Sequence, residues 1–381
     1  MRSIQTSLHQ DLKRKMVLLT GPRQVGKTTL AKQLGRQFKN PILLNYDVAE
    51  HAAVIESRAW LPSSDYLVLD ELHKMTQWKA YLKGVVDSKP VQQGLLVTGS
   101  ARLDTFRQAG ESLAGRYFQY HLMPFSVKEW VDAQGATPVQ ALDHLMRFSG
   151  FPEPCCAGND ADRLRWQNQY YSDLLREDIL EFGRIHELRA MRLLLEMLRS
   201  RTGSPLSYQS LARDLDVSPK TVQKYVDILV ALHIVFLVAP YHRNIARALS
   251  KAPKLYFYDW AYVKGDAGAI FENLIATSLL KHTHFLADTT GQVQTLHFVQ
   301  TTSGKEIDFV LANSEGDLEQ AIEVKWADSK PVYALREILE LHPNAKAIQL
   351  VYQLGTPYVP DPANPRLEVH PAAQWLNQLS A

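Results

Sequence analysis

The residues from Gly21 to Thr29, GPRQVGKTT, have the types and the spacing needed to bind a nucleoside triphosphate. They fit the pattern G-x-x-x-x-G-K-[ST], between an apolar stretch and a helical pattern that disfavour the alternative of a chance glycine-rich turn. Such a loop turns its N–H groups toward phosphate oxygens, Lys27 would reach the β and γ phosphates, and Thr28 would hold Mg²⁺. We therefore predict a site for ATP and Mg²⁺ formed by Gly21, Pro22, Arg23, Gln24, Val25, Gly26, Lys27, Thr28 and Thr29.

Two acidic residues, Asp70 and Glu71, end the apolar stretch LVLDE. The carboxyl end of a parallel strand faces bound nucleotide, so we expect Asp70 to bind Mg²⁺ and Glu71 to orient or deprotonate the attacking water. The alternative, an acid pair that caps a helix, fits less well after a phosphate-binding loop. Ser100, after the next apolar stretch, is a candidate for contact with the γ-phosphate or the water, although serine is also common in turns.

Arg116 lies in ESLAGRYFQYHL, at the start of a further expected strand. An arginine there is a candidate arginine finger that acts on a neighbouring subunit, or a sensor of the bound nucleotide. The alternative is an arginine that water solvates at the start of a strand. The sequence leaves both open.

A second set of charged residues lies in EIDFVLANSEGDLEQAIEVKW, residues 306–326, which predicts two short strands joined by a turn. Asp308, Glu323 and Lys325 alternate with apolar residues, so we expect them to share one face. Two carboxylates on adjacent strands, with Glu272 from a preceding helix, could hold Mg²⁺ or Mn²⁺, and Lys325 could position an attacking water or offset developing charge. The alternative is a solvated sheet face with a Glu–Lys pair.

The elements that must position the glycine-rich loop and the acid pair are predicted to form an α/β domain. Apolar stretches at about 16–20, 42–46, 66–70, 95–99 and 117–122 alternate with helical or loop segments, which is typical of a three-layer α/β/α fold. In the last segment the expected order is α-β-β-β-α-β, from the helix AIFENLIATSLLKH to the strand AKAIQLVY. The chain is therefore of the α/β multidomain class.

Between these parts the pattern is helical. Residues 126–200 predict a helical lid or connector. In residues 201–262, Ser207 could cap a short helix and Pro219 could open a second one, followed by strand material, which predicts a winged-helix module. The start of the second helix would expose Lys220 and Lys224 for DNA contact, although such modules are often only joints between domains. With an ATPase core at 1–125 and the last domain at 263–381, four parts are expected.

Composition limits the classes of protein that need considering. The 381 residues carry 42 basic and 40 acidic side chains, which is not the charge of a dedicated nucleic-acid binder, so any basic patch must be local. The longest apolar run, residues 228–240, is too short to cross a membrane. We predict that it forms the end of a buried helix followed by a strand. Adjacent Cys155 and Cys156 favour buried thiols and a cytoplasmic location.

Taken together, GPRQVGKTT, LVLDELHK, ESLAGR, SGFPEP, SPKTVQKYVDIL, PKLYFYDW, FENLI and EIDFVL…IEVKW resemble prokaryotic AAA-type ATPases with a C-terminal domain of uncharacterised function related to the PD-(D/E)XK nucleases. The resemblance covers nearly the whole chain. It implies a P-loop core with an additional strand and a catalytic glutamate, with Ser100 as sensor and Arg116 at the recurrent GR position. It also implies that Glu272, Asp308, Glu323 and Lys325 match the nuclease metal site, while Ser149 stands where relatives commonly have glycine.

Three functions are consistent with this sequence. The leading hypothesis is an ATP-hydrolysing switch or motor whose nucleotide state gates the C-terminal domain. The second is a metal-dependent DNA endonuclease for which ATP is only regulatory, and the third is a platform that binds nucleic acid or protein without catalysis. The expected partners are ATP, DNA through the winged helix and C-terminal domain, and further copies of the chain in a ring, with no membrane. The substrate and the pathway stay open.

Overall fold

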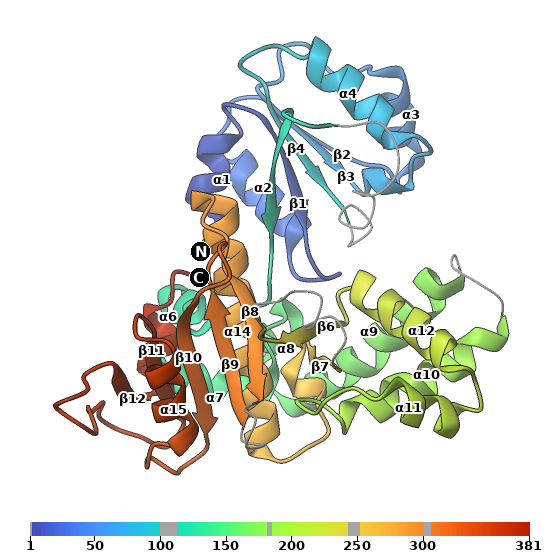
Figure 1. Ribbon diagram of the computed structural model, residues 1–381. Helices are drawn as coiled ribbons and strands as arrows, with labels where there is room; N and C mark the ends of the chain where they lie inside the picture. The colour runs from blue at the N-terminus through green and yellow to red at the C-terminus, as the bar shows by residue number, and fades with distance from the viewer. Residues whose placement is uncertain (1, 100–112, 181–184, 243–251, 301–305) are drawn as a thin grey trace. The chain divides into compact units, whose positions relative to one another are not determined.

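The computed structural model describes residues 2–99, 113–180, 185–242, 252–300 and 306–381 (Figure 1). The chain divides into two compact units. The first contains the residues up to Pro124 together with the short segments Ala231–His233 and Asp288–Gly291, and the second contains the rest.

The first unit contains a five-stranded parallel sheet in the order β2-β3-β4-β1-β5. Its strands agree within one residue with those expected from the sequence, namely β1 Met16–Thr20, β2 Pro41–Asn45, β3 Tyr66–Asp70, β4 Gly94–Thr98 and β5 Tyr117–His121. Strand β4 lies between β1 and β3. The strand before the glycine-rich loop and the strand of the acid pair are therefore not neighbours, but their carboxyl ends meet at the same edge of the sheet.

Helices cover both faces of this sheet, which confirms the three-layer prediction. One face packs on α3 (Ala49–Ser57) and α4 (Trp78–Ser88), in a core that includes Leu67, Leu69 and Val97. On the other face, the hydroxyl of Tyr66 donates to a carbonyl of α2 (Lys27–Gly35), and α1 (Gln5–Asp11) packs beside α2. Strands buried on both faces need continuous apolar sequence, which β1, β3 and β4 have.

The second unit begins with helices, as the sequence predicts for residues up to about 200. They are α6 Val127–Gln134, α7 Pro138–Phe148, α8 Pro152–Ala157, α9 Asp160–Leu180 and α10 Ile185–Arg199. Ser126 and Thr137 each cap a helix through a reciprocal hydrogen-bond pair with the third helical residue, which fixes where α6 and α7 begin.

Two short helices and two strands follow. Helix α11 (Tyr208–Leu215) is capped by Ser207, and Pro219 is the first residue of α12 (Pro219–Ala231), as expected. Strand β6 (Val235–Pro240) continues the apolar run, and β7 (Lys254–Phe257) pairs with it in antiparallel direction. Assignment of these elements to a winged helix stays a prediction, because β6 also pairs with β8 of a larger sheet.

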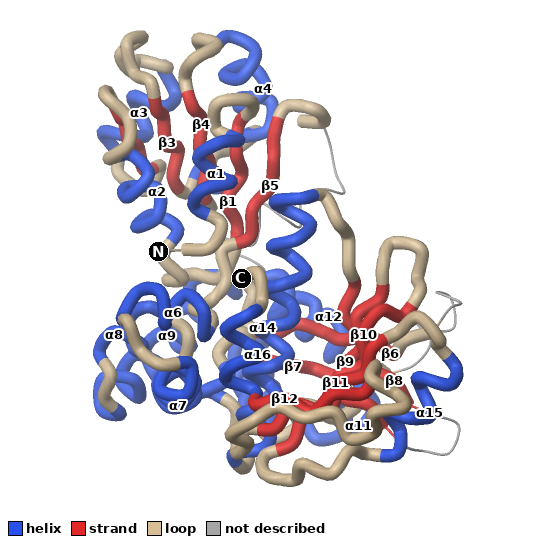
Figure 2. The backbone as a smooth tube through the Cα atoms, turned by 90° about the vertical axis from the view of Figure 1, so that its left-hand side faces the viewer, coloured by secondary structure: helices blue, strands red, loops and turns tan. Residues whose placement is uncertain are grey.

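That sheet has seven strands in the order β12-β11-β10-β9-β8-β6-β7 (Figure 2). The predicted order α-β-β-β-α-β is confirmed, and β12 with α16 extends it. The elements are α14 Ala267–Thr290, β8 Thr295–Gln300, β9 Glu306–Ala312, β10 Leu318–Lys325, α15 Tyr333–Leu341, β11 Lys346–Val351, β12 Leu367–Pro371 and α16 Ala372–Gln378. Helix α15 packs on one face through Leu335 and Ile338. No helix in the described ranges is long and apolar enough to span a membrane.

Candidate functional site

The glycine-rich loop joins β1 to α2 at the carboxyl edge of the five-stranded sheet. Gly21 has a φ of 137°, and a Cβ atom there would collide with the carbonyl oxygen of Leu122, so no larger residue fits. Gly26, with a φ of 102°, precedes the first turn of α2. The Nζ atom of Lys27 donates to the carbonyl oxygens of Gly21 and Pro22 at 2.9 and 2.7 Å. The loop thus surrounds its own lysine, which is 7% exposed.

Asp70, at the end of β3, receives hydrogen bonds from three elements. The hydroxyl of Thr28 donates to its Oδ2 atom at 2.8 Å, and the side-chain amide of Asn45, at the end of β2, donates to the same oxygen at 3.3 Å. The hydroxyl of Thr98, at the end of β4, donates to Oδ1. The two residues predicted to hold Mg²⁺, Thr28 and Asp70, are therefore in direct contact.

Glu71 follows Asp70 and has a backbone φ of 55°, which is in the left-handed region. Burial raises the pKa of its carboxyl group, while the positive charge of Lys27 opposes the increase. Its Oε2 atom is 3.5 Å from the Nδ1 atom of His73 and accepts no hydrogen bond from the residues that the structure describes. A buried carboxylate oxygen without a donor, close to a lysine, is suited to a water molecule or its proton.

Arg116 does not lie at this edge. It precedes β5, and Tyr117 is paired with Met16 at the amino end of β1, one strand length from the loop. Its guanidinium forms a two-point contact with Asp87, at 2.9 and 3.2 Å. This position does not support a role as sensor of the nucleotide bound to the same chain. That role and action on a neighbouring subunit both stay predictions. Ser100 lies outside the described residues.

Asn45 and Thr98 were not among the residues predicted from the sequence. A usable signal was present, because each is the polar last residue of an apolar strand. In a parallel sheet all such residues meet at one edge. Among the remaining loop residues, Val25 is buried, and Thr29 lies in the first turn of α2.

The second candidate site lies at the end of the β9–β10 pair. The Oδ2 atom of Asp308 accepts a hydrogen bond from the backbone N–H of Val324 at 2.8 Å. The Nζ atom of Lys325 donates to Glu323 Oε1 at 2.6 Å. Glu323 is only 5% exposed, so the alternative of a fully solvated sheet face is wrong, although the Glu–Lys pair that it included is present.

Glu323 has an unusual electrostatic environment. Burial and the neighbouring charge of Asp308 raise the pKa of its carboxyl group to about 7, and Lys325 opposes the shift. Burial also raises the pKa of Asp308. Burial would lower the pKa of Lys325, but its hydrogen bond to Glu323 outweighs that effect and the pKa is raised. The Oε2 atom of Glu323 is buried and has no hydrogen-bond partner in the described part of the chain.

Glu272, on α14, belongs to the same group of charges. Burial and Asp308 raise its pKa to about 7. Its Oε1 atom accepts a hydrogen bond from the hydroxyl of Tyr256 at 2.7 Å and lies 3.8 Å from the Nζ atom of Lys254. Lys254 also forms an ion pair with Glu306. Sequence reasoning missed these three residues; the signal was a lysine next to the apolar run LYFY in PKLYFYDW.

The donor chemistry of both sites fits hard cations, which prefer carboxylate and hydroxyl oxygens. At the nucleotide site the contact between Thr28 and Asp70 supplies such oxygens, and at the second site the unpartnered oxygen of Glu323 does. Within the described ranges, however, no three His, Cys, Asp or Glu residues are gathered so that they could hold a metal ion. The metal role of Glu272, Asp308 and Glu323 stays a prediction.

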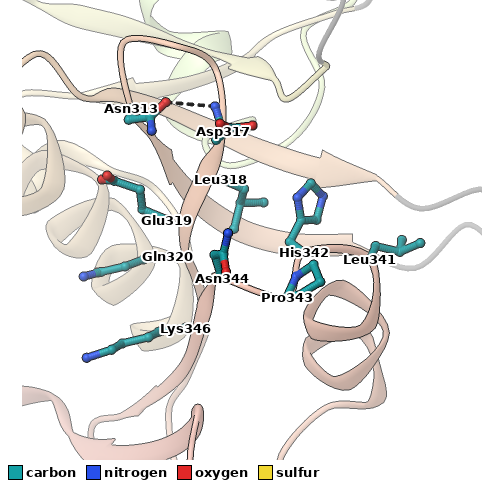
Figure 3. A pocket seen from close by; sticks show the side chains of 10 residues that line it. All are labelled: Asn313, Asp317, Leu318, Glu319, Gln320, Leu341, His342, Pro343, Asn344 and Lys346. Atoms are coloured by element: carbon teal, nitrogen blue, oxygen red, sulfur yellow. Dashed lines mark hydrogen bonds between the residues drawn. The ribbon is translucent and has the colours of Figure 1, made fainter.

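A pocket of about 500 Å³ lies at the opposite end of β9 and β10, near their connecting turn (Figure 3). The turn is closed by the backbone N–H of Asp317, which donates to the side-chain oxygen of Asn313 at 2.9 Å. The walls are Asn313, Asp317, Leu318, Glu319, Gln320, Leu341, His342, Pro343, Asn344 and Lys346. None of the residues predicted to do chemistry lines it.

Three segments of the chain match family models. Residues 13–131 match the model described as AAA domain. Residues 139–264 and 267–361 match two domains of unknown function, DUF8612 and DUF4143. The parallel sheet and the glycine-rich loop of the first segment agree with the AAA match and support an AAA-type P-loop domain. The relation of the last segment to PD-(D/E)XK nucleases stays a prediction.

Similar sequences occur in bacteria and archaea. Uncharacterized proteins of Mycobacterium tuberculosis and Mycobacterium bovis are each 30% identical over 251 residues, which cover 64% of this chain and 54% of theirs. An uncharacterized protein of Methanocaldococcus jannaschii is 22% identical over 301 residues, covering 64% of this chain and 61% of its own. The chain thus spans about half the length of its mycobacterial relatives.

The similarity of this chain to solved structures is weak. A variant of RuvB from Thermotoga maritima has a TM-score of 0.32 and 20% identity, covering 61% of this chain and 86% of its own. PCH-2 from Caenorhabditis elegans has a TM-score of 0.24 and 13% identity, covering 38% and 45%. These scores are too low to carry an argument about this chain.

Proposed function

We propose that this protein binds and hydrolyses Mg-ATP and that its nucleotide state controls the C-terminal nuclease-like domain. The observation that carries the first part is the contact of the Thr28 hydroxyl with Asp70, beside Lys27 in a glycine-rich loop. These groups come from three points in the sequence and meet at one edge of a parallel sheet. Their convergence supports a phosphate-binding role more strongly than the sequence pattern alone.

Each residue would have a distinct part in hydrolysis. The loop N–H groups and Lys27 would bind the phosphates, and Lys27 would leave the carbonyl oxygens of its own loop to do so. Thr28 and Asp70 would hold Mg²⁺, which neutralises charge on the phosphate oxygens. Glu71 would take a proton from the attacking water, or orient it. Thr98 and Asn45 would keep the carboxylate of Asp70 in place.

Replacement of Lys27 by Ala tests the site. Because Lys27 stabilises the transition state of phosphoryl transfer, we expect ATP turnover to fall to background in Lys27→Ala. Lys32→Ala, on the exposed surface of the same helix, is the matched control and should keep wild-type turnover. Unchanged turnover in Lys27→Ala, measured by phosphate release, would refute the assignment.

The proposed coupling involves the helices and the seven-stranded sheet. Helices α11 and α12 would form the helix-turn-helix of a winged-helix module, with Lys220 and Lys224 toward DNA. A ring of subunits would allow Arg116 to act on a neighbour, which requires that it exchange Asp87 for a phosphate. Stimulation of ATP turnover by DNA that survives Asp308→Ala would support coupling through binding rather than cleavage.

A second candidate function is a metal-dependent DNA endonuclease for which ATP is regulatory. The buried, unpartnered Oε2 atom of Glu323, in a group of carboxylates beside Lys325, favours it. Cleavage that depends on Mg²⁺ or Mn²⁺ should be lost in Asp308→Ala and kept in Glu71→Gln. Glu315→Ala, in the exposed β9–β10 turn, is the control. DNA binding in a gel shift with no product in any metal would instead support a non-catalytic platform.

A further inference from the structure

Lys254 is the first residue of β7 and precedes the part of the chain in which the other charged residues of the second site occur. It is 1% exposed. Removing an ammonium group from water costs several kcal/mol unless anions compensate it, so the position of Lys254 is set by its partners. Those partners are Glu306, in an ion pair, and Glu272, whose Oε1 atom is 3.8 Å from Nζ.

Two other described lysines are buried, and their surroundings differ. Lys27 lies in the nucleotide loop, and Lys281 pairs with Glu129, which is itself only 2% exposed. The partners of Lys254 are instead partly open to solvent, with side-chain exposures of 24% for Glu272 and 34% for Glu306. The buried ammonium group of Lys254 therefore stabilises the ionised form of two carboxylates that are partly exposed to solvent.

Among the residues that the structure describes, the charges of this group do not balance. Four carboxylates, Glu272, Glu306, Asp308 and Glu323, act on one another, and the described ammonium groups that pair with them are those of Lys254 and Lys325. Fully ionised, the group has a formal excess of two negative charges, the charge that one divalent cation cancels. Glu323 is more than nine-tenths buried, and its Oε2 atom has no partner among the described residues, which points independently to a ligand in the group.

We propose that Lys254 is a countercation of the C-terminal site. From β7 its ammonium group pairs with Glu272 and Glu306, as a metal ion would, and so weakens the binding of a divalent cation to the four carboxylates. This inference rests on the proposed metal site. Within the described ranges, no three carboxylates are arranged to hold a metal ion. The inference agrees with this, because Lys254 is paired with Glu272 and Glu306, and Lys325 is paired with Glu323. Lys254 is a positioning residue, because it acts through the carboxylates with which it pairs.

The test is Mn²⁺ binding to the nucleotide-free full-length protein, followed by the electron paramagnetic resonance signal of free Mn²⁺. Only binding that Asp308→Asn removes is counted, which excludes ions at Thr28 and Asp70. We expect Lys254→Met to bind Mn²⁺ at least tenfold more tightly than the wild type, since it removes a competing cation, and Lys254→Arg to remain near the wild type. Glu315→Gln, remote from the group, is the control.

Unchanged or weaker Mn²⁺ binding by Lys254→Met, with thermal unfolding that proves it folded, would overturn the inference. Where Lys254→Met does not fold, Lys254→Gln decides, because it removes the same charge but keeps a polar group beside Glu272 and Glu306, and it should also bind Mn²⁺ more tightly than the wild type. An unchanged affinity of that variant would contradict the proposal. Tight binding that appears only in Lys254→Met would support the countercation and reject the metal function of the wild type. If neither the wild type nor Lys254→Met binds Mn²⁺, the proposed metal site fails as well.

Discussion

Glu71→Gln separates hydrolysis of ATP from its binding. Glutamine keeps the size of the side chain but cannot accept a proton, and it leaves the hydrogen bonds from Thr28 to Asp70 and from Lys27 to Gly21 and Pro22 in place. A positioned general base contributes about 100- to 10,000-fold to a rate, or roughly 3 to 5 kcal/mol of transition-state stabilisation. We expect turnover to fall by that factor, while the Kd for ATP changes less than about threefold.

The pH dependence gives a second measurement on the same residue. Burial raises the pKa of Glu71 above its ordinary value, so the deprotonated base is lost at a higher pH than for an exposed glutamate. The acidic limb of kcat/KM should therefore lie above the pH expected for an ordinary carboxyl group. In Glu71→Gln that limb should disappear, because the remaining slow reaction no longer depends on this ionisation.

Backbone conformation adds a third criterion. The φ of 55° at Glu71 costs a residue with a side chain about 1 kcal/mol or more, which glycine avoids. Glu71→Gly should therefore increase the free energy of unfolding by about 1 kcal/mol, measured by denaturant titration, while it decreases turnover. A variant that keeps both wild-type turnover and the acidic limb would refute the role of Glu71 as base.

Three further outcomes are expected. Thr98→Val removes a hydrogen bond to the buried carboxylate of Asp70, so the free energy of unfolding of the first unit should fall by about 1.5 to 3 kcal/mol in denaturant titration. The variant should also need more Mg²⁺ for half-maximal turnover, and unchanged values would contradict the contact. Gly21→Ala should abolish binding of labelled ATP, whereas Gly135→Ala, with a positive φ but open space around it, should keep that binding. The pKa of Glu272 is raised from its ordinary 4.5 to about 7, so between these two pH values the folded state binds a proton that the unfolded state has lost. The free energy of unfolding should therefore fall as the pH rises from about 4.5 to 7. Glu272→Gln should flatten that dependence in thermal unfolding.

The sequence was sufficient for the elements of both sites because their patterns are local. The strand before Gly21, the strand that ends in Asp70, and the helix that Pro219 opens each have a boundary signal within a few residues. Contacts between distant segments were not predictable in this way. The bond from Asn45 to Asp70 depends on strand order, which single-strand patterns do not contain.

At the second site, too, contacts between distant segments were not predictable from local patterns. Alternation with apolar residues predicted that Asp308, Glu323 and Lys325 share one face, and Glu272 was expected from the preceding helix. The contribution of Lys254 from β7 was not predictable, because it depends on a contact with a distant strand. Burial then raises the pKa of the carboxyl groups of Glu272, Asp308 and Glu323, which no sequence pattern shows. Arg116 was predicted at the start of a strand, where it lies, but its contact with Asp87 of α4 was not predictable, because it joins segments far apart in the sequence.

The pairing of β6 with β8 limits how this protein can transmit force. Helix α12 continues into β6 after a short turn. Residues 235–238 of β6 pair with β7, and Ala239 and Pro240 pair with β8. A strand held in this way cannot slide by one residue without turning its apolar side chains outward. A displacement of α12 would therefore reach the seven-stranded sheet through β6, because β6 is hydrogen-bonded to both of its neighbours.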